Sequence, residues 1–303
     1  MITFKKFNKE EYSNGFVVTD KKLSKLYGIK GQNVFVLPCG EVAKSFFYAK
    51  KLCSWLLQRG AQKDDVVVAV GGGSVGDLVG FVASVYKRGV KLVHVPTTLV
   101  AQIDSAIGGK TALDLDGVKN AVGSFYVADT VIDVGFLKTL PEKQRKNGQG
   151  ELIKYRMLNP EIDVVFAQGD VENTVRSCAQ YKQLVCERDP SDKSERKILN
   201  FGHTVGHAME LCLGLSHGEA VANGLYYETL IACKLGYVDC AYLQRWQGEI
   251  EKLFSLKPIT AQILQHTLHD KKNKDGKICV VLPQKTGFAE QYFSLEELTE
   301  LLV

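Results

Sequence analysis

The stretch Val66-Val-Val-Ala-Val70-Gly71-Gly-Gly73-Ser-Val-Gly76-Asp77 decides which fold we expect for the first half of the chain. A β-branched run enters a glycine-rich turn and an apolar helical pattern follows, so the sequence predicts a strand, a tight turn and a helix. Glycines let the backbone approach a pyrophosphate, and the amides at a helix N-terminus bind its oxygens. The glycine spacing alone is a weak signal, but this context favours a dinucleotide site over a turn without a ligand.

Around this stretch, short apolar runs alternate with helical patterns through the first 140 residues. The predicted strands are Gly15–Asp20, Val34–Leu37, Val66–Val70 and Lys91–Val95, and the predicted helices are Glu41–Arg59 and Val75–Lys87. Strands that are largely continuous in apolar residues are typical of a parallel sheet covered on both faces. We therefore predict a Rossmann-like, doubly wound α/β domain over residues 1–140.

The pattern becomes helical near Leu140-Pro141. Helical periodicity is found in Glu142–Leu158, Asp170–Glu187, Lys197–Leu213, Gly218–Leu235 and Ala241–Phe254. We predict a second, mostly α-helical domain over residues 141–303.

Three of the six histidines lie within fifteen positions of this helical half. His203 and His207 are four residues apart in Asn200-Phe-Gly-His203-Thr-Val-Gly-His207, so a helix there places both on one face, and His217 follows it in the chain. Imidazole is the commonest side-chain ligand for metals such as zinc. The group favours a metal site over packed or surface histidines, although His-x-x-x-His alone is only a moderate signal.

A polar segment follows the strand Lys91–Val95. Pro96-Thr-Thr-Leu-Val-Ala-Gln-Ile-Asp104-Ser-Ala-Ile-Gly-Gly-Lys110-Thr111 carries hydroxyls, a carboxylate, two glycines and a lysine, and Lys119-Asn120 comes soon after. Loops at strand ends are where sites are built, so a functional segment is favoured over a simple capping loop. The strand itself ends without an acidic residue for a ribose hydroxyl, which leaves Glu41 and Asp20 as candidates.

Composition excludes several classes of protein. No apolar run approaches the roughly 18 residues that span a bilayer, and the N-terminus lacks the apolar stretch of a signal peptide. The eight cysteines show no Cys-x-x-Cys spacing and are interpreted as reduced residues of a cytoplasmic protein. A net charge of +4 is too small to indicate nucleic-acid binding and fits a small anionic ligand.

Taken together, these motifs resemble 3-dehydroquinate synthase, a family of the sugar phosphate cyclase superfamily. The resemblance runs from about Asp20 to about Ala289. It is carried by Pro38-x-Gly40-Glu41-x-x-Lys44, the glycine loop, the segment 96–111, Lys119-Asn120, Glu151-Leu-Ile-Lys154-Tyr155, Arg196-x-x-x-Asn200-Phe-Gly-His203-x-x-Gly-His207, His217-Gly-Glu-Ala-Val221 and Asp270-Lys-Lys272. The threonine-to-lysine segment and the histidine block are highly specific for sugar phosphate cyclases.

The resemblance implies an NAD- and metal-dependent carbon–oxygen lyase of the shikimate pathway, which leads to the aromatic amino acids. Such an enzyme converts 3-deoxy-D-arabino-heptulosonate 7-phosphate to 3-dehydroquinate and phosphate by transient oxidation, phosphate elimination, re-reduction and aldol closure. Its metal is usually zinc or cobalt. Arg88 matches an arginine that reaches into the neighbouring subunit's site, which implies a homodimer. Neither a nucleic-acid nor a membrane partner is expected.

The resemblance also implies roles for individual residues. The metal ligands fall on Glu151, His203 and His217, which assigns His207 to the substrate. The catalytic residues implied are His207, Asn200, Lys154, Lys110, Arg196 and Asp104. Further substrate contacts fall on Lys119, Asn120, Lys182, Arg88 and Lys272. NAD contacts fall on Asp20, Glu41, Lys44, Gly72, Gly73, Ser74, Asp77, Thr97, Thr98, Lys110 and Lys119. Residues 1–140 would thus bind NAD, and residues 141–303 the metal and the substrate.

Several positions depart from the family pattern. Lys22 stands where a nucleotide-binding asparagine is usual, Gly150 replaces an alanine, and Arg156 replaces a glycine. Pro190 and Ser194 alter an acidic stretch before the substrate-binding arginine. We expect Lys22 to affect adenosine affinity and Arg156 to crowd the helix that carries the metal-binding glutamate.

Three alternatives remain open at this point. They are another sugar phosphate cyclase that forms an inosose or a valiolone, a metal-dependent polyol dehydrogenase, and a non-catalytic NAD- or anion-binding module. A carboxylated substrate is favoured over the other cyclase substrates by the retained set Lys182, Arg196, Asn200, His207 and Asp270-Lys-Lys272. A dehydrogenase would produce net NADH, whereas the complete ligand set argues against a non-catalytic module.

Overall fold

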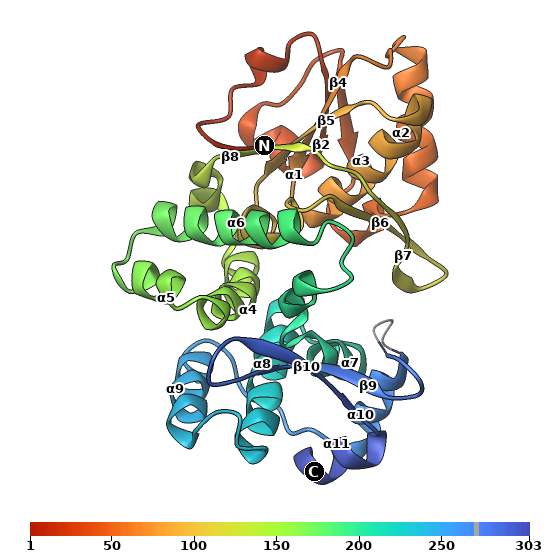
Figure 1. Ribbon diagram of the computed structural model, residues 1–303. Helices are drawn as coiled ribbons and strands as arrows, with labels where there is room; N and C mark the ends of the chain where they lie inside the picture. The colour runs from red at the N-terminus through yellow and green to blue at the C-terminus, as the bar shows by residue number, and fades with distance from the viewer. Residues whose placement is uncertain (270–272) are drawn as a thin grey trace. The chain divides into compact units, whose positions relative to one another are not determined.

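In the computed structural model, which describes residues 1–269 and 273–303, the chain divides into two units (Figure 1). Unit 1 consists of Met1–Pro141 and Val171–Glu187, and unit 2 consists of Glu142–Asp170 and Arg188–Val303. The chain passes from unit 1 to unit 2 one residue after the predicted boundary, but the helix at 171–187 groups with unit 1. The division into an NAD-binding and a metal- and substrate-binding domain stays a prediction. Lys272 lies outside the described residues.

Unit 1 is built on a six-stranded sheet with the order β1-β8-β5-β4-β2-β3. Its strands are β1 (Ile2–Phe4), β2 (Phe16–Asp20), β3 (Val34–Leu37), β4 (Val66–Gly71), β5 (Lys91–Pro96) and β8 (Asp129–Ile132). All neighbouring strands are parallel. Buried side chains pack on both faces, because Val67 and Ala69 belong to one hydrophobic cluster and Val68 and Val70 to another. The predicted doubly wound α/β fold is therefore confirmed.

Helices and a hairpin complete unit 1. They are η1 (Lys9–Tyr12), α1 (Lys21–Tyr27), η2 (Glu41–Ala43), α2 (Phe46–Gln58), α3 (Gly73–Val85), η3 (Tyr86–Arg88), η4 (Ala101–Ser105), η5 (Val134–Thr139), α6 (Val171–Arg188) and the antiparallel strands β6 (Lys110–Leu115) and β7 (Val118–Phe125). The predicted helix Glu41–Arg59 is broken: Ser45 is extended and begins α2. Lys44 precedes this break and is buried.

The glycine loop joins β4 to α3 as the sequence predicts. Gly72 is the N-cap of α3, and a Cβ on Gly71 would lie 2.5 Å from Cβ of Val75. A larger residue at Gly71 would therefore push the helix away from the turn. Gly71 pairs with Pro96, the last residue of β5, so both strands end at the same edge of the sheet. Ligands of such folds bind at the carboxyl ends of the strands.

Unit 2 is mostly helical. Its elements are α4 (Glu142–Leu158), α5 (Pro160–Ala167), η6 (Glu195–Asn200), α7 (His203–Leu213), α8 (His217–Lys234), α9 (Cys240–Glu251), α10 (Ala261–Gln265), η7 (His266–His269), α11 (Leu295–Leu302) and the antiparallel strands β9 (Ile278–Pro283) and β10 (Phe288–Phe293). A buried cluster that includes Val205, Ile231 and Val280 joins α7, α8 and β9. The helical prediction holds for most of the unit, whereas the hairpin was not predicted.

The predicted helix Lys197–Leu213 is interrupted, and this interruption shapes the site. Gly202 has a φ of 78°, which is the left-handed region, and α7 begins only at His203. Asn200 belongs to the preceding 3-10 helix η6. The prediction of one helix over Lys197–Leu213 is therefore wrong, and Asn200 and His207 lie on different elements.

Glycines set the spacing of the helices in unit 2. A Cβ on Gly224 of α8 would lie 1.9 Å from the carbonyl oxygen of Gly202. A Cβ on Gly150 of α4 would lie 2.0 Å from the carbonyl oxygen of Gly218. The backbones thus approach more closely than any residue with a side chain allows. The replacement of the family's alanine by Gly150 is explained by this contact.

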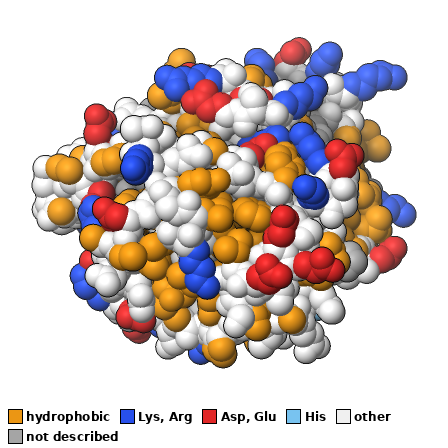
Figure 2. Space-filling view, turned by 60° about the horizontal axis from the view of Figure 1, so that its bottom comes forward, with side chains coloured by type: hydrophobic (Ala, Val, Ile, Leu, Met, Phe, Trp, Pro, Cys, Tyr) orange, Lys and Arg blue, Asp and Glu red, His pale blue; other side chains and the backbone are white. Residues whose placement is uncertain are grey.

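Charged and apolar side chains are mixed on the surface, and the cysteines are reduced. Blue and red side chains are interspersed with orange ones on the face that Figure 2 presents. None of the eight cysteines, all of which lie in the described residues, forms a disulfide. Within residues 1–269 and 273–303, no helix combines the length and apolar character that crossing a bilayer requires.

Candidate metal and cofactor sites

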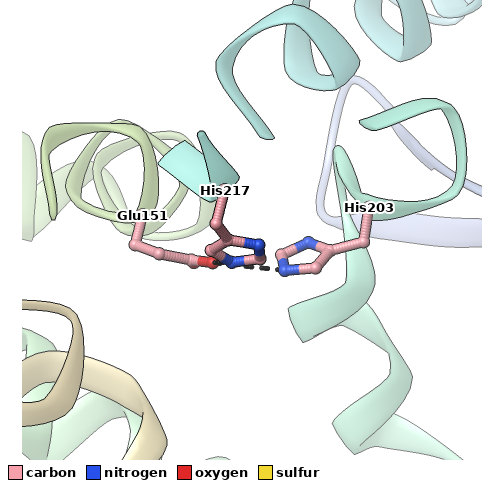
Figure 3. Close-up of side chains that lie close together, drawn as sticks. All are labelled: Glu151, His203 and His217. Carbon is pink, nitrogen blue, oxygen red and sulfur yellow. Dashed lines mark hydrogen bonds and ion pairs between the residues drawn. The ribbon is translucent and has the colours of Figure 1, made fainter. Parts of the chain in front are cut away.

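Three side chains of unit 2 converge on one point (Figure 3). Oε1 of Glu151, on α4, lies 2.8 Å from Nε2 of His217 and 3.2 Å from Nε2 of His203. The potential ligand atoms of the three residues all lie within 4.8 Å of one another. His203 is the first residue of α7 and His217 the first residue of α8, which begins one residue before the predicted helix Gly218–Leu235.

Lys154 keeps the carboxylate of this group ionised. Its Nζ lies 2.6 Å from Oε2 of Glu151, one turn away on α4, and both side chains are almost fully buried. Burial alone would raise the pKa of Glu151, but the charge of Lys154 and the contacts with the imidazoles of His203 and His217 lower it well below its usual value. Glu151 is therefore an anion that can serve as a metal ligand.

His217 is held between two carboxylates. Its Nε2 contacts Glu151, and its Nδ1 lies 3.3 Å from Oε2 of Glu210 on α7. Burial opposes protonation, but hydrogen bonds to Glu151 and Glu210 raise the pKa of His217 to about 10, so a metal ion binds here by displacing the proton from Nε2. An imidazole whose second nitrogen contacts a carboxylate is oriented for metal binding, and the sequence reasoning did not identify Glu210. Its position three residues after His207, on the same helix face, was the available signal.

His203 is oriented by the backbone instead. Its Nδ1 lies 3.1 Å from the carbonyl oxygen of Phe201, which favours the tautomer that leaves Nε2 as the electron-pair donor. Burial lowers the pKa of His203, and its contact with Glu151 opposes this only in part. A neutral imidazole facing a carboxylate is the protonation state that a metal requires.

The donor set fits a catalytic zinc-like ion. Two imidazole nitrogens and one carboxylate are the protein ligands of one common class of catalytic zinc site, which leaves a fourth position for water or substrate. His207 does not belong to this group, and its ring centroid lies 5.2 Å from that of His203. His207 is also exposed, whereas the potential ligands are buried or half-buried.

A turn held by Asp189 precedes the other predicted substrate residues of unit 2. Its carboxylate accepts hydrogen bonds from the amides of Lys193 at 3.0 Å, Ser194 at 2.7 Å and Arg196 at 3.1 Å. Burial opposes ionisation, but these amides lower the pKa of Asp189 to about 2. Asp189 thereby fixes the turn that carries Pro190 and Ser194, and Arg196 is buried where the turn ends.

Most of the predicted NAD residues gather at the glycine loop of unit 1. Nζ of Lys44 lies 2.9 Å from Asp77 of α3 and 3.7 Å from Glu41, and the hydroxyl of Ser74 donates to Glu41. Burial raises the pKa of Asp77 to about 6, although Lys44 opposes the shift. Lys44 also donates to Oδ1 of Asn120 on β7, a predicted substrate residue.

Thr97 and Thr98 line the other side of the loop. The amide of Thr97 donates to the carbonyl of Gly71 at 3.0 Å, and a Cβ on Gly72 would lie 2.9 Å from the methyl group of Thr98. His94 lies beneath this loop on β5, and burial lowers its pKa to about 4, so it is neutral near pH 7. His94 was not singled out from the sequence, because nothing in its strand distinguishes it.

Asp20, the last residue of β2, is the N-cap of helix α1. Its Oδ1 accepts the amides of Lys22 at 2.8 Å and Leu23 at 3.0 Å and so caps α1. Lys22 contributes a backbone amide to this cap, and its side chain is exposed. The carboxylate nevertheless lies at the carboxyl edge of the sheet, next in register to Leu37 of β3.

The remaining predicted substrate residues of unit 1 lie on five elements, η3, η4, β6, β7 and α6. Nζ of Lys182, on α6, lies 2.6 Å from Oδ1 of Asp104, and both side chains are largely buried. Lys182 is therefore not a scattered surface lysine. Lys110 begins β6 and Lys119 lies on β7. Arg88 is exposed and has a φ of 63°.

Arg156 does not crowd the metal-binding group, which corrects the expectation from the sequence. Its Nε lies 2.7 Å from Asp163 of α5, and a terminal nitrogen lies 2.6 Å from Glu249 of α9. The guanidinium also stacks at 4.0 Å from the ring centroid of Phe166. Arg156 thus joins α4 to α5 and α9.

Comparisons with known proteins identify the family. Residues 34–147 match a family model described as 3-dehydroquinate synthase N-terminal, and residues 148–273 match one described as 3-dehydroquinate synthase C-terminal. The chain belongs to the 3-dehydroquinate synthase family. A 3-dehydroquinate synthase of Dictyoglomus thermophilum is 38% identical, with 97% of this chain and 89% of the relative covered. One of Dehalococcoides mccartyi is 40% identical, with 89% of this chain and 80% of the relative covered.

Solved structures of other cyclases share the fold. ValA, a 2-epi-5-epi-valiolone synthase from Streptomyces hygroscopicus subsp. jinggangensis 5008 with NAD+ and Zn2+ bound, has a TM-score of 0.85 at 24% identity and covers 100% of this chain and 95% of its own. A 2-deoxy-scyllo-inosose synthase complexed with carbaglucose-6-phosphate, NAD+ and Co2+ has a TM-score of 0.82 at 25% identity, with 99% and 96% covered. An iron-containing alcohol dehydrogenase has a TM-score of 0.61 at 15% identity, with 99% and 95% covered.

Proposed function

We propose that the protein is a 3-dehydroquinate synthase that converts 3-deoxy-D-arabino-heptulosonate 7-phosphate to 3-dehydroquinate and phosphate. The observation that carries the proposal is the buried group Glu151, His203 and His217, in a chain whose relatives of 38 to 40% identity bear that name. Inosose- and valiolone-forming cyclases share the fold at only 24 to 25% identity. The substrate class is a small phosphorylated sugar acid.

The cofactors proposed are NAD, and Zn2+ or Co2+. Glu151, His203 and His217 would hold the metal, and Gly72, Gly73, Ser74 and Asp77 would lie against NAD, with Asp20, Glu41, Lys44, Thr97, Thr98, Lys110 and Lys119 as further contacts. When bound, the metal supplies Lewis-acid polarisation of a substrate hydroxyl and NAD supplies a hydride acceptor.

The protein's own residues then bind and orient the substrate. Lys154 keeps Glu151 ionised, and its ammonium group provides a buried positive charge beside the metal ligands. Arg196 and Lys182 are buried cations suited to carboxylate or phosphate oxygens, because charge-assisted hydrogen bonds are stronger in a desolvated site. His207, exposed one turn after His203, is positioned to exchange a proton with the substrate.

The proposed set of substrate contacts also includes Lys110, Lys119, Asn120, Asp104 and Asn200. Lys272 belongs to this set as well but lies outside the described residues. Departing phosphate can itself accept the proton lost from carbon, so no strong protein base is required for the elimination. The hydride removed in the oxidation would return to the substrate ketone after the elimination, so no net NADH would form.

A cytoplasmic homodimer is part of the proposal. Arg88 and the preceding Lys87 both have positive φ, at 63° and 47°, which is uncommon for residues with side chains. This backbone strain holds Arg88 exposed at the end of η3, where it can reach a second copy of the chain.

The test supplies the heptulosonate phosphate, NAD and zinc, and follows phosphate release and NADH absorbance together. Phosphate and 3-dehydroquinate without net NADH is the expected result. Net NADH would identify a dehydrogenase, and silence from zinc-loaded protein would identify a non-catalytic module.

Variants separate the metal ligands from the substrate residues. His203→Ala should abolish turnover and lower the bound metal, because it removes a ligand. His207→Ala should keep the metal but lose rate. Full metal content and near-normal turnover in the first variant would refute the assignment, and metal loss in the second would show that the ligand set is different.

A further inference from the structure

Helix α7, which carries a metal ligand at its first position, begins at a residue that cannot cap it. Gly202 is the N-cap, with a φ of 78°, and a Cβ there would lie 2.7 Å from the side chain of Leu225. The backbone angle and the packing both require glycine. Glycine has no side chain to accept hydrogen bonds from the amides of the first turn, which need a partner when they are buried.

Glu228, on α8, supplies both missing acceptors. Its Oε2 accepts the amide of Gly202 at 2.6 Å, and its Oε1 accepts the amide of Val205 at 3.1 Å. These are the N-cap and N3 amides, the two that a capping box satisfies with two side chains of the same helix. Here the carboxylate of Glu228, on the neighbouring helix α8, accepts both hydrogen bonds.

The cost of burying its charge keeps the carboxylate of Glu228 hydrogen-bonded to the N-terminus of α7. Glu228 is fully buried, and an ion removed from water at such a site costs several kcal/mol unless it is compensated. Two amide hydrogen bonds and the positive end of the helix dipole provide that compensation. The carboxylate and the first turn of α7 therefore stabilise each other.

This arrangement ties two metal ligands to one helix. His203 lies between the two anchored amides, and α8 itself begins at His217, eleven residues before Glu228. Gly224, one turn before Glu228, brings the two backbones together at the same crossing. Movement of the first turn of α7 along α8 would therefore change the distance between the imidazoles of His203 and His217.

We propose that Glu228 is a positioning residue for the metal site, because it fixes the start of α7 on α8 and so sets the separation of two imidazole ligands. The proposal rests on the proposed function only in that a divalent metal binds to Glu151, His203 and His217.

The test is the zinc affinity of the metal-stripped full chain, measured by competition with a chromophoric chelator, together with the visible spectrum of the cobalt-substituted protein. Glu228→Gln keeps the shape but removes the charge and turns an NH2 group toward one amide. We expect zinc Kd to rise about tenfold, at the lower end of the effect of residues that orient metal ligands. The cobalt bands should change because the ligand geometry changes.

Glu249→Gln is the matched control. Glu249 is a half-buried carboxylate of the same unit that pairs with Arg156 and lies on α9, so its loss should lower stability without moving a ligand. Its zinc Kd should stay within about twofold of wild type, well below the effect expected of residues that orient ligands. Wild-type Kd and wild-type cobalt bands in Glu228→Gln would overturn the proposal, whatever the change in stability.

If Glu228→Gln does not fold, Glu228→Asp takes its place, because it keeps the charge and withdraws it by one methylene. A raised zinc Kd in that variant supports the proposal, and an unchanged Kd overturns it. Neither measurement needs substrate. Zinc-loaded wild-type protein that forms no 3-dehydroquinate would refute the proposed function and leave the role of Glu228 standing.

Discussion

Arg156→Met tests whether the buried arginine of α4 stabilises the helix packing or interferes with the metal site. Methionine keeps much of the volume and removes the charge. Arg156 is largely buried and contacts Asp163 at 2.7 Å and Glu249 at 2.6 Å. Removing one partner of a buried ion pair costs about 3–5 kcal/mol.

The loss expected from the ion pairs lies at the lower end of this range. Asp163 also pairs with Arg245, and Glu249 also pairs with Lys252, so neither carboxylate is left without a cation. Loss of the guanidinium from the face of Phe166 adds about 1 kcal/mol. The ion pairs contribute about 3 kcal/mol and the cation–π contact about 1 kcal/mol, so we expect a decrease of about 4 kcal/mol in the free energy of unfolding, or about 6 °C in Tm for a chain of this size.

Metal affinity should not change. Arg156 follows Glu151 by five residues, so their side chains project about 140° apart around α4. The measurement pairs urea unfolding of the variant with its zinc Kd. Arg245→Met is the control, since Arg245 shares Asp163 but is 56% exposed and should contribute less than about 1 kcal/mol. A loss below that of the control, or tighter zinc binding, would refute the reasoning and support crowding.

Three further predictions concern unit 2. Glu210→Gln should weaken zinc binding about tenfold with little change in Tm, because His217 loses the carboxylate that orients it; an unchanged Kd would contradict this. Gly224→Ala should lower both Tm and zinc affinity, because its Cβ would lie 1.9 Å from the carbonyl oxygen of Gly202; a normal Tm would show that the helices separate without cost. The pKa of Asp189 is lowered to about 2, so its stabilising contribution is complete above the unfolded pKa of about 4 and disappears as pH falls toward 2. The difference in urea midpoint between wild type and Asp189→Asn should therefore shrink from pH 5 to pH 2, and a constant difference would exclude this role.

Local patterns predicted much of the structure because they are set by short-range physics. The run Val66–Val70 and the glycines after it form the predicted strand, turn and helix, and the four predicted strands of unit 1 formed close to their predicted bounds, whereas β1, β6, β7 and β8 were not predicted. The helix Glu142–Leu158 has the predicted bounds. The hairpin Ile278–Phe293 was not predicted, although Ile278–Leu282 is an apolar run of the kind that indicated strands in unit 1; its buried residues pack in one cluster with those of α7 and α8.

The prediction of one continuous helix through the histidine block, Lys197–Leu213, was wrong. Periodicity cannot show that Gly202 adopts a left-handed conformation, because that choice depends on the close approach of α8. The same limit applies to Arg156, because its partners Asp163 and Glu249 lie on other helices, 7 and 93 positions away in the chain.

The sequence by itself determined which residues carry the chemistry, namely the glycine loop and the glutamate and histidines of the family motif. The family resemblance already named His203 and His217 as the partners of Glu151, but only the tertiary structure brings their ligand atoms together, since ligand geometry depends on where α4, α7 and α8 cross. It also decided which carboxylates support them, because Glu210 and Glu228 act across space on residues that lie seven to twenty-six positions away in the chain. The His-x-x-x-His spacing placed His203 and His207 on one face of a helix, but the crossing with α8 made only His203 part of the buried metal-binding group.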